Sequence, residues 1–209
     1  MQVTTPRITV TAPSSSSGKT LATMGIIYGL KRLGYRVQPF KVGPDFIDPS
    51  YLKAVAGIYA INLDLWMMGK SGILNAFSKW CSQSNACVIE GVMGYLDGAY
   101  ADSDRFFGST YRISGMLKSN IILVIDVSRT AQTALAIAEG IARFSGGKVG
   151  VIANRVAGKA HAEYIRKALS GHKKIIFAGF INEDKSLQLE ERYLGLVPAA
   201  ERHINYLEI

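Results

Sequence analysis

The chain of 209 residues is long enough for one sizeable domain with its own hydrophobic core. Hydrophobic residues make up 48% of the sequence and charged residues 19%, a globular composition that excludes an intrinsically disordered protein. The net charge of +8 favours an anionic partner, and the scattered Lys and Arg residues argue against nucleic acid. The first residues lack signal-peptide features, and the apolar runs are too short to cross a bilayer. We therefore expect a cytoplasmic protein without membrane contacts.

Short apolar segments alternate with longer segments of helical periodicity along the chain. Strands are predicted at 7–12, 36–40, 86–90, 121–126, 149–154 and 175–181. Helices are predicted at 19–33, 71–84, 108–118, 131–144 and 159–170. This alternation predicts an α/β domain of three layers, with a mainly parallel central sheet flanked by helices. We find no repeat or linker that would divide residues 1–209 into separate domains.

The segment after the first predicted strand has the composition of a phosphate-binding loop. It reads APSSSSGKT over residues 12–20 and leads directly into a predicted helix, as in P-loop NTPases. Its backbone N–H groups can cradle phosphates, Lys19 can reach the β- and γ-phosphates, and Thr20 can bind Mg²⁺. Pro13 replaces the first glycine of the usual pattern. We predict that ATP is bound by Ser15, Ser16, Ser17, Gly18, Lys19 and Thr20.

Acidic residues follow later strands, at the sheet edge where the phosphate loop should lie. Asp45 and Asp48 come after the second strand among the loop signals Gly-Pro and Asp-Pro, so we expect both on a turn. Glu90 ends the third strand, just before a glycine-rich segment at 91–98 that contains Asp97. Each acid also has an alternative structural role as a helix cap or turn former.

Phosphoryl transfer requires Mg²⁺, which is held by carboxylate and hydroxyl oxygens. The predicted metal ligands are Thr20, Asp45 and Glu90. Asp48 and Asp97 could orient the acceptor or stabilise charge, and Asp126 ends the fourth strand nearby. The predicted catalytic residues are Lys19, Asp45, Asp48 and Asp97.

Six segments in order along the chain resemble a known family. They are APSSSSGKT at 12–20, QPFKVGPDFIDPSYL at 38–52, NLDLW at 62–66, VIEGVMGYLDG at 88–98, ANRVAGKAH at 153–161 and GLVPAAE at 195–201. Together they resemble the synthetase domain of the cobyrinate a,c-diamide synthase family, in the dethiobiotin-synthetase-like P-loop group. Relatives usually have glycine at the position of Ser16 and often tyrosine at that of Phe46. They also carry a C-terminal glutaminase domain, and neither cysteine here has the glycine flanks of its nucleophile.

The resemblance implies a carbon–nitrogen ligase that amidates the a- and c-acetate carboxylates of cobyrinate in cobalamin biosynthesis. ATP and Mg²⁺ would convert each carboxylate into an acyl phosphate, and ammonia would displace the phosphate. Nitrogen would come from glutamine through a glutaminase domain or subunit, or from free ammonia. Residues 1–209 would form the ATP-binding amidoligase domain, in a possible homodimer. Asn154 stands where relatives recognise adenine.

A polycarboxylate tetrapyrrole combines an apolar macrocycle with peripheral negative charges. Aromatic and methionine side chains could contact the ring, with core packing as their alternative role, and these are Tyr51, Tyr59, Trp66, Met67, Met68, Met93 and Tyr95. Arg105, Arg112 and Lys118 could meet the carboxylates, with a solvated helix face as the alternative. Cys81 and Cys87 are expected to be free thiols.

Three other functions are compatible with parts of the pattern. The first is the same diamidation of Ni-sirohydrochlorin, which the sequence does not separate from that of cobyrinate. The second is a partitioning or regulatory P-loop ATPase, against which the all-serine stretch at 14–17 counts because it lacks an early second lysine. The third is a dethiobiotin-type carboxylation enzyme, which the extended glycine-rich segment disfavours. His161 is expected to have a surface or capping role.

Overall fold

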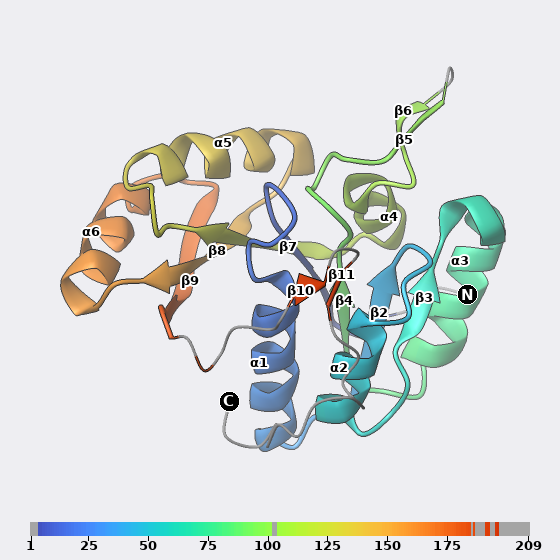
Figure 1. Ribbon diagram of the computed structural model, residues 1–209. Coiled ribbons are helices and arrows are strands. Elements are labelled where there is room, and N and C mark those ends of the chain that lie inside the picture. Colours follow the sequence, from blue (N-terminus) through green and yellow to red (C-terminus); the bar gives the residue numbers. More distant parts are fainter. Residues whose placement is uncertain (1–3, 102–103, 185, 187–190, 193–194, 197–209) are drawn as a thin grey trace.

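The computed structural model describes residues 4–101, 104–184, 186, 191–192 and 195–196. Seven parallel strands form one sheet in the order β3-β2-β4-β1-β7-β8-β9 (Figure 1). They are β1 (Arg7–Thr11), β2 (Val37–Val42), β3 (Ile61–Leu63), β4 (Ala86–Glu90), β7 (Asn120–Asp126), β8 (Val149–Val156) and β9 (Ile175–Asn182). The predicted parallel α/β sheet is therefore confirmed.

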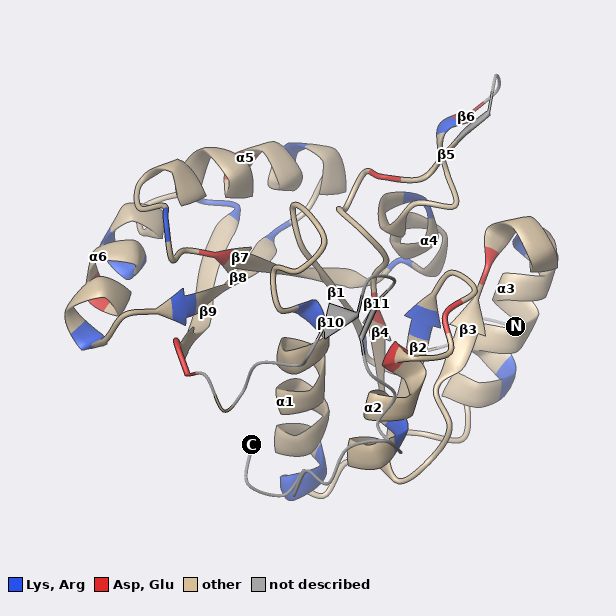
Figure 2. Cartoon of the chain, in the orientation of Figure 1, with Lys and Arg blue, Asp and Glu red and all other residues tan. Residues whose placement is uncertain are grey.

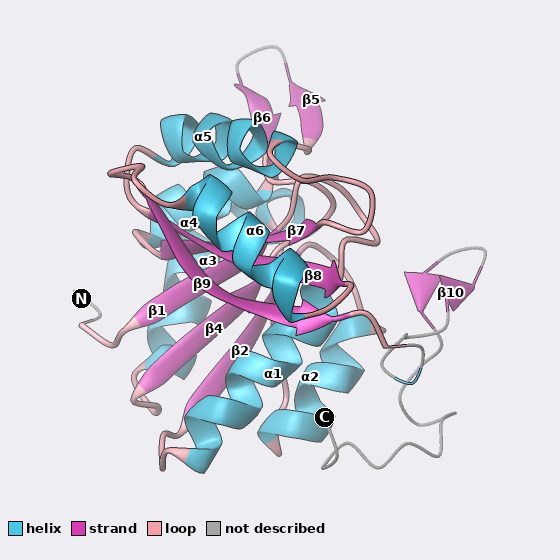
Figure 3. Cartoon of the chain, turned by 90° about the vertical axis from the view of Figure 1, so that its left-hand side faces the viewer, coloured by secondary structure: helices cyan, strands magenta, loops and turns pink. Residues whose placement is uncertain are grey.

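Helices cover both faces of the sheet (Figure 3). On one face lie α1 (Lys19–Arg32) and α2 (Asp48–Ala56), and on the other lie α3 (Leu65–Cys81), α4 (Thr110–Leu117), α5 (Thr133–Ser145) and α6 (Lys159–Leu169). Two small hairpins lie outside the sheet, β5 (Ala99–Ala101) with β6 (Asp104–Phe107), and β10 (Glu191–Arg192) with β11 (Gly195–Leu196). No helix within the described residues has the length and apolar character needed to span a membrane.

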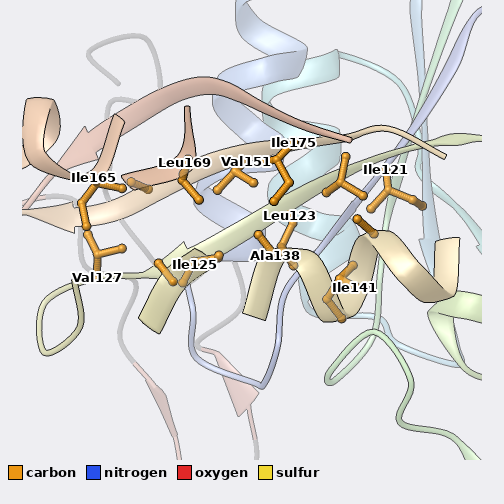
Figure 4. Packing of buried hydrophobic residues seen from close by; sticks show 14 of the residues in the cluster. Ile121, Leu123, Ile125, Val127, Ala138, Ile141, Val151, Ile165, Leu169 and Ile175 are labelled. Atoms are coloured by element: carbon orange, nitrogen blue, oxygen red, sulfur yellow. The ribbon is translucent and has the colours of Figure 1, made fainter. Parts of the chain in front are cut away.

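Apolar side chains fix this arrangement. Leu123 and Ile125 of β7 pack with Ile141 of α5 and with Ile165 and Leu169 of α6 (Figure 4). Burial of each such side chain contributes about 1.5–3 kcal/mol. A second cluster packs α1 and α2 onto β1, β2 and β4, and a third packs α3 and α4 on the opposite face. Packing of the helices on both faces therefore fixes the position of the strands and of their carboxyl ends.

The segment at 45–49 differs from the prediction. Asp45 lies on the expected turn, but Asp48 begins α2 instead of continuing a loop, and Pro49 lies in its first turn. Proline is tolerated there because its missing N–H would have no partner within the helix. The Asp-Pro pair therefore marked the start of a helix. The short β3 and the β5–β6 hairpin were also not predicted, since three or four residues give little periodicity.

The two cysteines form a disulfide, and the prediction of free thiols is wrong. Cys81 ends α3 and Cys87 lies in β4, and a short turn returns the chain so that their Cα atoms are 6.1 Å apart. This separation lies in the range that a disulfide can bridge. Both residues are buried in the third apolar cluster.

Candidate active site

The phosphate loop joins β1 to α1 at the carboxyl edge of the sheet. Its backbone is left-handed at Ser16, where φ is 59°, and at Gly18, where φ is 91°. The left-handed backbone at Ser16 suits glycine better than serine, which agrees with the glycine expected at this position in relatives. No side chain of the described residues caps the N-terminus of α1. Its first N–H groups therefore point at the loop and can bind an anion.

Two neighbouring segments hold the loop in place. Asn154, at the end of β8, donates from Nδ2 to the Ser17 carbonyl at 3.0 Å. A Cβ atom on Gly18 would lie 2.1 Å from the same Nδ2, so glycine is required there. From the other side, the Tyr95 N–H donates to the Ala12 carbonyl at 2.9 Å. Recognition of adenine by Asn154 stays a prediction, and the observed contact adds a role in shaping the loop.

Lys19 is folded back onto the phosphate loop. Its Nζ donates to the Ser14 carbonyl at 2.9 Å, and the side chain is buried. Burial, followed by the positive charge of Lys41, lowers the pKa of Lys19 to about 8. A phosphate arriving at the loop would replace the carbonyl contact and would favour the charged ammonium.

Lys41, which was not among the predicted site residues, lies at the centre of the acidic residues. Lys41 on β2 aligns with Glu90 on β4, so both side chains project from the same face of the sheet. Its Nζ lies 3.1 Å from Glu90 Oε1 and 3.6 Å from Asp45 Oδ2, and it bonds Asp48 Oδ2. Figure 2 shows basic and acidic positions together where β2, β4 and α2 meet. A lysine inside the mostly apolar strand VQPFKV was the available signal, since a buried charge needs a partner.

Glu90 has the geometry expected of a metal ligand. It is fully buried, and its Oε1 accepts a hydrogen bond from Thr20 Oγ1 at 2.7 Å. Its Oε2 has no hydrogen-bond partner among the described residues. Adjacent ligands of octahedral Mg²⁺ lie about 2.9 Å apart, so the spacing of the Thr20 and Glu90 oxygens fits this ion. The described residues contain no group of three or more His, Cys, Asp or Glu arranged for a metal.

Asp45 and Asp48 lie beside this pair. Burial raises the pKa of both carboxyls, and each is raised further by a neighbouring acid, Asp48 for the first and Glu90 for the second. Asp45 also accepts the Ile47 N–H through Oδ1 at 2.8 Å, so it stabilises the turn as well as facing Lys41. The structure thus brings together three of the predicted acids around one ammonium.

Two other acids lie outside this cluster. Asp97 is exposed, and its Oδ2 accepts the Gly94 N–H at 3.0 Å, which closes a turn of the glycine-rich segment. Its charge raises the pKa of Lys19, as the last of several influences. Asp126, at the end of β7, pairs with Arg155 at 2.6 Å. Asp97 thus matches the structural alternative of a turn former, whereas the ion pair of Asp126 was not among the expected roles.

Large apolar side chains are exposed on the segments that follow β2, β3 and β4, with Trp66 and Met67 in the first turn of α3. Phe46 is 78% exposed, Trp66 77% and Met67 75%, and Met93 is 44% exposed. Trp66 also contacts Phe107 of the β6 strand edge-to-face, with ring centroids 5.9 Å apart. An apolar surface of this kind beside charged groups is typical of a ligand site.

Other residues considered for the macrocycle lie elsewhere. Tyr51 and Tyr95 are 0% and 2% exposed, so they have the core-packing role given as the alternative for them. Met68 packs against the third apolar cluster. Tyr59 precedes β3, at the opposite edge of the sheet, where Lys53 covers its ring at 3.8 Å.

Among the predicted surface residues, Arg112 is paired with Asp104 at 2.6 Å, while Arg105 is exposed on β6. Lys118 lies in the left-handed cap that ends α4. His161 accepts the Ala157 N–H through Nδ1 at 3.2 Å, which confirms its predicted capping role. The residues of GLVPAAE from 197 onward lie outside the described part of the chain.

Comparison with curated proteins identifies close relatives. The chain is 41% identical over 192 residues to a cobyrinate a,c-diamide synthase of Sulfolobus acidocaldarius, covering 91% of this chain and 42% of the relative. It is 41% identical over 198 residues to that of Listeria monocytogenes, with coverage of 93% and 43%. For that of Methanosarcina acetivorans the identity is 38% over 201 residues, with coverage of 94% and 40%. The chain thus spans about two fifths of the length of these relatives.

Comparison with solved structures supports the fold alone. The signal recognition particle receptor FtsY of Elizabethkingia anophelis with GDP matches with a TM-score of 0.63 and 15% identity, covering 90% of this chain and 60% of that one. A nucleotide-binding protein of Archaeoglobus fulgidus in complex with ADP matches with a TM-score of 0.55 and 13% identity, with coverage of 87% and 83%. At this identity the likeness extends to the P-loop NTPase architecture.

A family model covers the sheet, the phosphate loop and the lysine–carboxylate cluster. It matches residues 8–196 and describes a CobQ/CobB/MinD/ParA nucleotide-binding domain. With this match, and with the loop between β1 and α1 shaped to receive an anion, the chain belongs to the CobQ/CobB/MinD/ParA nucleotide-binding domain family.

Proposed function

We propose that residues 1–209 form an ATP-dependent amidoligase domain that activates the a- and c-acetate carboxylates of cobyrinate for amidation. The observation that carries the proposal is the meeting of Lys19, Lys41 and three carboxylates at one sheet edge. It is supported by about 40% identity to proteins named cobyrinate a,c-diamide synthase. Because the chain spans only part of those proteins, their activity is a proposal for this chain.

The chemistry requires a leaving group better than oxide. A carboxylate oxygen of the substrate attacks the γ-phosphorus of ATP, the bond to ADP breaks, and an acyl phosphate forms. Ammonia then attacks the acyl carbon, phosphate leaves, and nitrogen loses a proton to give the amide. Lys19 and the N–H groups at the start of α1 would hold the β- and γ-phosphates and offset the charge on the transferred group.

Thr20, Glu90 and Asp45 are the residues that would hold Mg²⁺. The 2.7 Å Thr20–Glu90 contact and the unpaired Glu90 Oε2 support this set. When bound, the ion would neutralise negative charge on the phosphates. Asp48 is assigned to holding Lys41, and Asp97 to shaping the loop next to Lys19.

The exposed apolar side chains provide the surface for the macrocycle. We assign Phe46, Trp66, Met67 and Met93 to contacts with the ring, since they follow β2, β3 and β4 beside the cluster. Lys70 on α3 and Arg105 on β6 are exposed and could pair with carboxylates outside the reacting one. Nitrogen would be supplied as ammonia, either free or released by a glutaminase domain or subunit.

A mass-spectrometric assay tests this function. The chain is incubated with ATP, Mg²⁺ and ammonium, and either cobyrinate or Ni-sirohydrochlorin, and each amide formed lowers the substrate mass by about one unit. We expect diamidation of cobyrinate. Diamidation of Ni-sirohydrochlorin alone would transfer the proposal to that substrate, whereas partner-stimulated hydrolysis of ATP without amidation would favour a regulatory ATPase.

Lys19→Ala tests the phosphate-loop assignment in the same assay. The variant should lose ATP turnover and retain its circular dichroism spectrum, because the Lys19 ammonium contacts a backbone carbonyl of the phosphate loop. Lys167→Ala, an exposed position on α6, is the matched control and should keep full activity. Full activity of Lys19→Ala would remove the assignment.

A further inference from the structure

Lys41 is a buried cation whose role the proposed function leaves open. Its side chain is 3% exposed, and its Nζ also donates to the Gly91 carbonyl at 3.2 Å. With Asp45, Asp48 and Glu90, Lys41 therefore faces oxygen atoms on several sides. These contacts place the ammonium among three carboxylates and one backbone carbonyl.

The charges explain why a cation must be present. Three carboxylates surround one ammonium, and Glu90 among them is fully buried. A buried carboxylate without a counter-ion is strongly unfavourable. Lys41 is the nearest cation to Glu90, at 3.1 Å, so it stabilises this residue whenever no metal is bound.

Lys41 and a magnesium ion would share the same oxygen atoms. Glu90 Oε1 contacts both Thr20 Oγ1, at 2.7 Å, and Lys41 Nζ, at 3.1 Å. Asp45 Oδ2, from the same proposed ligand set, lies 3.6 Å from the ammonium. A divalent ion bound to these oxygens would lie within about 5 Å of the lysine charge, where repulsion is large.

We propose that Lys41 is an internal counter-ion that occupies the place of Mg²⁺ in the nucleotide-free chain and opposes binding of the free ion. The triphosphate brings its own negative charges, which offset the added positive charge, so that metal and nucleotide bind together. Lys41 thus couples metal loading to nucleotide loading. The inference rests on the proposed ATP site and makes Lys41 a positioning residue for the metal ligands.

The inference is tested by titrating the chain with Mn²⁺ in the absence of nucleotide and tetrapyrrole. Calorimetry or electron paramagnetic resonance measures the binding. Lys41→Met should bind Mn²⁺ at least about tenfold more tightly than the parent chain, because one competing positive charge is removed. Lys167→Met, with the same change of charge on exposed α6, should leave the affinity unchanged. Equal or weaker binding by folded Lys41→Met would overturn the inference.

Loss of the lysine could prevent folding, so a second pair of variants keeps the comparison possible. Asp48→Asn and Lys41→Met/Asp48→Asn differ only in the lysine, and the double variant has the same net charge as the parent chain. The double variant should bind Mn²⁺ at least about tenfold more tightly than Asp48→Asn. Equal affinities would overturn the proposal. The amide assay tests the proposed function separately. A failure of the Mn²⁺ prediction can therefore be distinguished from a failure of the proposed function.

Discussion

Two ion pairs lie at the carboxyl edge of the same parallel sheet, and their surroundings differ. Lys41 and Glu90, at the ends of β2 and β4, are 3% and 0% exposed. Arg155 and Asp126, at the ends of β8 and β7, are 37% and 26% exposed. Both pairs consist of a basic and an acidic side chain within about hydrogen-bond distance, at 3.1 and 2.6 Å.

The difference shows that the N–O distance alone does not predict which of the two ion pairs contributes more to stability. Water screens the Arg155–Asp126 pair, so its contribution is small although its contact is shorter. The Lys41–Glu90 pair has lost its hydration, and removal of one partner leaves an uncompensated buried charge. Thr20 of the phosphate loop contacts this buried pair through Glu90. The buried charges therefore lie at the proposed site of phosphoryl transfer.

The largest expected effect is a loss of stability in Lys41→Met. Removal of the ammonium takes from the buried Glu90 the cation in contact with it and should lower the free energy of unfolding by about 3–5 kcal/mol. Urea denaturation of the parent and the variant measures the change. A loss below about 1 kcal/mol would show that the acids take up protons or water and that the cluster is not a buried ion network.

The next effect concerns the pH dependence of nucleotide affinity. The pKa of Lys19 is lowered to about 8, so the free chain loses this charge as pH rises through 8, whereas bound phosphate favours the protonated form. ATP affinity should fall by up to about tenfold per pH unit above 8, with proton uptake on binding. Calorimetry in buffers of different ionisation enthalpy measures both quantities.

Lys19→Arg is the control for this pH dependence. A guanidinium stays protonated throughout the range, so its ATP affinity should not decline between pH 8 and 9. An identical decline in parent and variant would assign the titration to another group.

A smaller effect is expected at the exposed ion pair. Arg155→Met removes the same kind of charge from Asp126 as Lys41→Met removes from Glu90. Because both side chains reach solvent, the free energy of unfolding should fall by at most about 1 kcal/mol. Urea denaturation at low and high salt measures it, and a loss equal to that of Lys41→Met would contradict the comparison.

The smallest effect is expected in the phosphate loop. Ser16 has a φ of 59°, which glycine adopts more readily, so Ser16→Gly should raise the free energy of unfolding by about 0.5 kcal/mol. Ser15→Gly is the matched control: Ser15 is not among the residues with positive φ, so the variant should lose a few tenths of a kcal/mol. Thermal unfolding of both variants tests the sign, and equal shifts would exclude backbone strain at Ser16.

Local patterns were sufficient for much of the fold. The apolar segments around 121–126 and 149–154 predicted β7 and β8 because a parallel sheet buries both faces of its strands. Gly18, Lys19 and Thr20 predicted the phosphate loop because their chemistry depends on neighbours in sequence. Asp48 was misplaced because Asp-Pro occurs both in turns and at helix starts.

The sequence by itself determined the alternation of strands and helices, the phosphate loop and the acids that follow the strands. Only the tertiary structure decided that Lys41 lies among those acids. The strands β2 and β4 are far apart in the sequence, and the strand order β3-β2-β4-β1 makes them neighbours in the sheet. Register then pairs Lys41 with Glu90. Contacts between residues 49 positions apart depend on packing of the whole sheet, which no local pattern encodes.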